Sequence, residues 1–171
     1  CMYHAMDNLG IAQYLSRIGL LLGATEALDA GKAAWMEGDA WQGLRRYTED
    51  CLVVRDPFEL FVAQNVALDG LLYPLVYQGI VDDQFAAAGG SLVAMLTQFM
   101  SDWFDETRKW VDAVMKVAAA ESEHNRALLQ AWTIQWRDRA AAALLPVIEQ
   151  EFAGNADEVM SEQLAAFRVR L

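Results

Sequence analysis

Glu121 and His124 are the residues whose types and spacing are best suited to chemistry, within the segment Glu121-Ser122-Glu123-His124. A glutamate and a histidine three residues apart share one helix face, so both side chains can reach one metal ion. Bundles that hold a carboxylate-bridged di-iron centre use this pair twice, with a single glutamate from each of two other helices. One such pair is weak evidence, and solvated residues near a helix start fit it equally well.

A complete second set of ligands for such a centre is not present in the sequence. Cys1 and His4 have the required spacing, but a thiolate does not replace a bridging carboxylate on iron. Asp69 stands alone in the middle of an apolar stretch, and Asp102 and Asp105 have no histidine beside them. We therefore predict no catalytic, cofactor-binding or metal-ligating residues, with Glu121 and His124 as the weaker alternative.

A small polar group, His4, Asp7 and Asn8, lies within the apolar start of the chain. On a helix, Asp7 and Asn8 fall next to His4. A buried aspartate beside an imidazole would hold it protonated. We expect a metal-free hydrogen-bonded cluster, and both readings of its role stay open: a device that fixes helix register, or the remains of a metal site.

The composition predicts an all-α protein. Hydrophobic residues make up 55% of the 171 residues, with only three prolines and many good helix formers. The pattern indicates a first helix over residues 1–22, apolar on nearly every side as at the centre of a bundle, and a second over 41–54. We expect residues 1–171 to form a single ferritin-like domain, a helical bundle with additional C-terminal helices, truncated at both ends.

The later elements are predicted from capping residues and breaks. Asp56 suits the N-cap of a buried helix that begins at Pro57, with Glu59 completing a capping box and Pro74 causing a kink. A connection through residues 79–90 precedes a helix capped by Ser91. Further helices are expected after a break near residues 118–120 and from about residue 157.

Charge and cysteine content limit the possible partners and the compartment. The net charge of −11 argues against nucleic acid and disfavours an anionic membrane surface. Residues 60–81 are long enough to cross a bilayer, but their spread of polar side chains favours a buried helix of a soluble bundle. Two cysteines without a pairing pattern, and no signal peptide, predict a cytoplasmic protein.

Four segments carry a resemblance to a known family: YHAMDNLGIAQYLSRIGLLL, NVALDGLLYPLVYQ, LVAMLTQFMSDW and AAESEHNRALLQAW. They resemble the β subunit of the bacterial multicomponent monooxygenase hydroxylases, closest to the phenol hydroxylase and toluene monooxygenase group. The resemblance implies a ferritin-like bundle without a metal site. It implies that Cys1 and His4 stand where one Glu-x-x-His motif would be, Leu68 or Asp69 near the single-glutamate position, and Asp102 and Asp105 near the second motif. It also implies that Glu121 and His124 lie on a later helix, outside that site.

The resemblance implies a structural function within an enzyme complex. Catalytic α subunits, which hold the di-iron centre, would assemble with β and small γ subunits as α2β2γ2 to hydroxylate phenol, toluene or similar compounds with O₂ and NADH-derived electrons. This chain would support α without a cofactor of its own. Two alternatives remain: a self-contained metal-binding protein that uses Glu121 and His124, and a plain helical interaction module.

Overall fold

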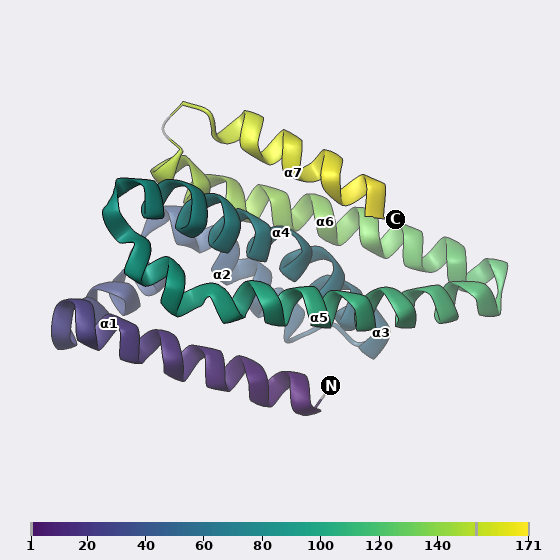
Figure 1. The fold of residues 1–171 in the computed structure, drawn as a ribbon. Coiled ribbons are helices and arrows are strands. Elements are labelled where there is room, and N and C mark those ends of the chain that lie inside the picture. Colours follow the sequence, from purple (N-terminus) through teal and green to yellow (C-terminus); the bar gives the residue numbers. More distant parts are fainter. Residues whose placement is uncertain (1, 153, 171) are drawn as a thin grey trace. The chain divides into compact units, whose positions relative to one another are not determined.

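All regular elements in the described part of the chain are helices (Figure 1). The computed structural model describes residues 2–152 and 154–170, so Cys1 lies outside the described residues. The all-α prediction is confirmed. Contacts divide the chain into two compact units, Cys1–Gln42 and Gly43–Leu171. A single domain over residues 1–171 stays a prediction, and each unit is described by itself.

The first unit is built from α1, Met2–Glu37, which contains a break at Gly23 and Ala24. Ala24 has φ 52° and ψ −152°, so the helical path is interrupted directly after residue 22. The predicted end of the first helix at Leu22 is therefore correct. The segment after the break is helical through Glu37. Leu28 lies back against the first piece, with its Cδ2 3.0 Å from where a Cβ on Gly19 would stand.

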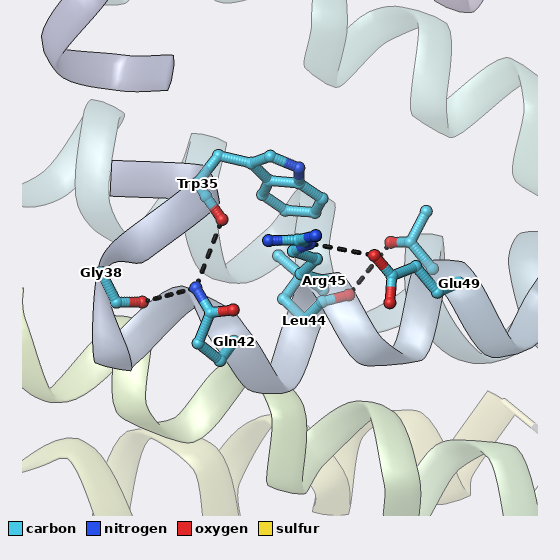
Figure 2. Close-up of polar contacts among 7 residues, drawn as sticks. Trp35, Gly38, Gln42, Leu44, Arg45 and Glu49 are labelled. Atoms are coloured by element: carbon cyan, nitrogen blue, oxygen red, sulfur yellow. Dashed lines mark hydrogen bonds and ion pairs between the residues drawn. The ribbon is translucent and has the colours of Figure 1, made fainter. Parts of the chain in front are cut away.

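Gly38 separates α1 from α2, Asp39–Cys51. Its backbone N–H donates to the carbonyl of Ala34 at 2.8 Å, and a Cβ at Gly38 would lie 2.7 Å from that same oxygen. Figure 2 shows the Gln42 amide donating to the carbonyls of Gly38 and Trp35, at 3.1 and 3.4 Å. The bond to Trp35 satisfies a carbonyl in the last turn of α1, where the helix offers no partner, whereas the Gly38 carbonyl also accepts from the Trp41 N–H at 3.0 Å.

The second unit has as its centre a continuous helical run of four elements: α3 (Pro57–Phe61), η1 (Val62–Leu68), α4 (Asp69–Tyr73) and η2 (Pro74–Gly90). The Asp56 carboxylate caps this run by accepting from the backbone N–H groups of Phe58 and Glu59, at 2.8 and 3.3 Å. The predicted N-cap is confirmed. The buried residues of this run lie between Val62 and Tyr77, as expected for a core helix, whereas residues 83–89 are largely exposed.

The end of this run differs from the sequence prediction. Residues 79–90, expected as a connection, belong to the π-helix η2, which ends where Gly89 adopts φ 101°. Ser91 was expected to cap the next helix, and this is wrong: Gly90 is the N-cap and no side chain bonds there. Pro74 stands at the start of η2. Proline lacks an N–H, so the regular hydrogen-bond ladder changes at this residue.

Three long helices complete the second unit: α5 (Ser91–Glu121), α6 (Glu123–Glu151) and α7 (Ala156–Arg170). Helix α5 packs on η2 and α6, α6 packs on η1, and α7 packs on α6 and α4. Figure 1 shows α5 and α6 as an antiparallel pair that turns sharply between them. The break lies at Ser122, whose backbone is extended and whose hydroxyl oxygen accepts from the Asn125 N–H at 3.1 Å.

One helical stretch in the described part of the chain, Pro57–Glu121, is long and apolar enough to cross a membrane. Length and composition alone do not separate a membrane span from the core helix of a soluble protein. Half of its most apolar window is buried within the protein, and it contains the buried carboxylate of Asp69. A charged group at that depth in a bilayer is costly, which favours the interpretation as a core helix.

Candidate functional site in the helical core

Asp69 is the predicted site residue that the structure buries most deeply, with 6% of its surface exposed. It opens α4, and its backbone N–H bonds to the carbonyl of Gln64, five residues earlier, which closes a π turn. Tyr73 follows one turn later and is also buried. Burial, and secondly the Asp69 carboxylate, raise the pKa of Tyr73 well above its ordinary value. Asp69 is therefore a core carboxylate with a tyrosine beside it.

Asp102 and Asp105 lie on the exposed side of α5. The Asp105 carboxylate contacts Arg108 Nη2 at 3.3 Å on the same helix, and both side chains are about half exposed. Phe104, between the two aspartates, is the residue that points into the core, with 4% exposed. The helix therefore turns these carboxylates away from Asp69, and the three do not form one set of ligands.

Glu121 and His124 do not share a helix, because α5 ends at Glu121 and α6 begins at Glu123. The expectation that they occupy one helix face is wrong, since the extended backbone of Ser122 interrupts the helical spacing. Glu121 Oε2 accepts instead from Asn125 Nδ2 at 3.1 Å. His124 is exposed on the first turn of α6.

His4, Asp7 and Asn8 lie together on α1 as expected, but with different chemistry. Asn8 Nδ2 donates to the backbone carbonyl of His4 at 3.0 Å. Burial lowers the pKa of the His4 imidazole, and the opposing effect of Asp7 is smaller. The expected buried aspartate beside the imidazole is wrong, because Asp7 is exposed, and the burial of His4 disfavours its charged form.

A di-iron centre, which the resemblance places in another subunit, does not fit the residues that the structure describes. In residues 2–152 and 154–170, no three histidine, cysteine, aspartate or glutamate side chains lie close enough to hold one metal ion. A centre of this kind needs four carboxylates and two imidazoles that converge. Among the described residues of the second unit, Asp69 is the one buried carboxylate, and it lies near Tyr47 and Tyr73.

A polar network around Trp136 was not found from the sequence. Trp136 is 2% exposed, and its indole N–H donates to Glu59 Oε1 at 3.0 Å, which joins α6 to α3. The Tyr47 hydroxyl donates to the carbonyl of Ala63 at 2.8 Å, and its ring meets Trp136 edge-on at 5.3 Å. Arg139 lies over the Trp136 ring at 4.2 Å and forms an ion pair with Asp50. The only sequence signal was the helical spacing of the tryptophans, which shows burial but not a partner.

Comparison with known proteins identifies the family. The model of a family described as methane/phenol/alkene hydroxylase matches residues 1–122. The chain belongs to this family. The matched region contains the first unit and the part of the second unit that ends at the break after α5.

Three relatives with known names are similar to this chain. It is 54% identical to the phenol 2-monooxygenase oxygenase component DmpL of Pseudomonas sp. (strain CF600), over 99% of this chain and 51% of the relative. It is 47% identical to the component MhpL of Acinetobacter pittii (strain PHEA-2), over 85% of this chain and 44% of the relative. It is 26% identical to the toluene-4-monooxygenase hydroxylase subunit beta of Ectopseudomonas mendocina, over 68% of this chain and 36% of the relative.

A solved structure gives the same result for the fold. The chain matches a xenon-pressurized phenol hydroxylase from Pseudomonas sp. OX1 with a TM-score of 0.84 and 45% identity, over 97% of this chain and 52% of that chain. The helical-bundle prediction and the phenol hydroxylase resemblance are therefore both confirmed. The chain spans about half the length of the relatives that it matches.

Proposed function

We propose that this chain is part of the non-catalytic β-type subunit of a multicomponent monooxygenase hydroxylase of the phenol and toluene class. The observation that carries the proposal is the 54% identity to an oxygenase component over 99% of this chain. The similarity to a relative named as a beta subunit supports the assignment within the complex. The proposed assembly contains catalytic α and small γ subunits as α2β2γ2, lies in the cytoplasm, and uses O₂ and NADH-derived electrons.

The geometry supports a structural function for this chain. Its deepest carboxylate, Asp69, is buried near Tyr47 and Tyr73, and its other acidic candidates on α5 are exposed. This arrangement of the described residues supports a chain whose core holds helices together. Exposed apolar side chains on α1, such as Leu9 and Leu21, supply surface that further polypeptide can cover.

Coexpression with the remaining components of a phenol hydroxylase tests this function. We expect the chain, within a full-length subunit, to copurify with the catalytic subunit, and the iron to follow the catalytic subunit when the two are separated. Iron retained by the separated β-type subunit would contradict the proposal. In that case His124→Ala tests whether the metal is held by Glu121 and His124, because a site built on these two residues would lose its metal in the variant.

A further inference from the structure

A small cavity of about 220 Å³ lies where the start of α3, the end of α5 and the first turns of α6 meet. It is lined by Asp56, Phe58, Glu121, Asn125, Leu128 and Trp132, among others. All of them belong to the second unit. Pockets for free organic ligands usually measure about 300–1,000 Å³, so this volume is suited to a single side chain.

Two carboxylates face this cavity, and both are fixed in place. Asp56 Oδ1 accepts from the N–H groups of Phe58 and Glu59, and Glu121 Oε2 accepts from Asn125 Nδ2. Within the described residues neither carboxylate forms an ion pair, and no lysine or arginine lines the cavity. The site thus holds two oriented negative charges without a cation, on a chain whose net charge is already −11.

The walls of the cavity between these carboxylates are apolar. Phe58, Leu128 and Trp132 are partly exposed, and Leu129 is buried beneath them. An aromatic face attracts a cation through its quadrupole, and an aliphatic wall accommodates the methylene stem of a long side chain. The combination of acidic rim and apolar wall complements one kind of group, a cation on an apolar stem.

We propose that this cavity receives an arginine side chain of another subunit of the hydroxylase. Arginine fits better than lysine, because its planar guanidinium can bond to two carboxylates at once and stack on an indole or phenyl ring. Asp56 and Glu121 bind the guanidinium, and Trp132 and Phe58 contact its plane and stem. This inference rests on the proposed function, since it names a contact within that assembly.

Charge-neutralising variants of the full-length subunit test the contact. Asp56→Asn keeps a good N-cap residue and removes the charge, and Glu121→Gln keeps the side-chain shape. Each is expected to weaken binding to the other hydroxylase subunits about tenfold, because the guanidinium loses one of its two partners. Glu162→Gln on α7, exposed and remote from the cavity, is the matched control and is expected to leave binding unchanged.

The outcomes separate this inference from the proposed function. If the unmodified subunit does not assemble, the proposed function fails. If it assembles and the two cavity variants, shown by circular dichroism to be folded, bind as well as wild type, the arginine contact is wrong. Equal weakening by Glu162→Gln also overturns it, because the effect is then one of net charge.

A small probe supplies an independent measurement on the same site. Acetyl-arginine amide is expected to shift the Trp132 indole resonance, assigned through Trp132→Phe, in wild type and not in Asp56→Asn/Glu121→Gln. The absence of any shift in wild type contradicts the proposed recognition. A shift without any assembly defect in the variants assigns the cavity to a free organic cation and overturns the subunit contact.

Discussion

Two buried aromatic side chains of the second unit, Trp136 and Tyr47, each have a specific hydrogen-bond partner. The indole of Trp136 and the hydroxyl of Tyr47 both donate hydrogen bonds that cross from one helix to another. Leaving such a donor or its acceptor without a partner costs about 1–3 kcal/mol, so these bonds select one arrangement of helices. Sequence reasoning assigned Glu59 to a local capping box, but its Oε1 accepts from Trp136, 77 residues later.

Tyrosine ionisation should limit the stability of the second unit at high pH. Burial raises the pKa of Tyr77 to about 12 from 10.0, and raises the pKa values of Tyr47 and Tyr73 further. The folded state keeps protons that the unfolded state releases above pH 10, so this stability is complete below pH 10 and is lost as pH rises toward the folded pKa. Urea unfolding from about pH 9 to about pH 11.5 should show a falling free energy of unfolding. Tyr77→Phe removes one ionisable hydroxyl, so the free energy of unfolding should fall by about 2 kcal/mol less in this variant than in wild type over the same pH range. A parallel decline in wild type and variant would contradict this.

Elements whose signals are local were predictable, and elements set by tertiary packing were not. Asp56, Pro57 and Glu59 mark a helix start within four residues, and the structure has the Asp56 N-cap that they predict. The bend after Leu22 follows from Gly23. The π-helix over residues 74–90 was not predicted, because the glycine and aspartate residues in this segment are typical of a loop. The separation of Glu121 from His124 depends on Ser122 acting as an N-cap, which the motif itself conceals.

Helix α2 approaches α6 closely at Gly43. A Cβ there would lie 3.3 Å from the Cα of Ala143 and 3.4 Å from its carbonyl oxygen, and backbone atoms cannot move aside cheaply. Gly43→Leu should therefore force the helices apart and lower the free energy of unfolding by about 1–3 kcal/mol. Gly31→Leu is the matched control, because nothing lies within 4 Å of its Cβ position. Thermal unfolding measures both, and equal shifts would show that the close approach is unimportant.

At the scale of the whole molecule, the family assignment came from sequence segments and not from the candidate site. The expected ligand positions do not converge in the described residues, and so the geometry of a site could not have led to the hydroxylase family. Apolar periodicity over long stretches gave the helical fold, and part of each stripe in the second unit is buried, such as Met100 and Phe104 on α5 and Leu144 and Ile148 on α6. Periodicity shows that a helix has an apolar face, but it does not show whether the chain itself buries that face or leaves it exposed. Helix α1 was expected to be surrounded, yet large parts of it face solvent.

The exposed apolar face of α1 should make the chain associate when it is alone. Ile11 and Ile18 are buried on one side, whereas Leu9 and Leu21 are 72% and 82% exposed. Such surface favours association, since removing it from water gains about 25 cal/mol per Å². We expect concentration-dependent oligomers by analytical ultracentrifugation, and Leu9→Lys/Leu21→Lys should shift the chain toward monomer. Gln13→Lys/Ser16→Lys adds the same charge at exposed polar positions of the same helix and should have a much smaller effect. If both double variants dissociate the oligomers equally, charge repulsion and not the apolar face controls association.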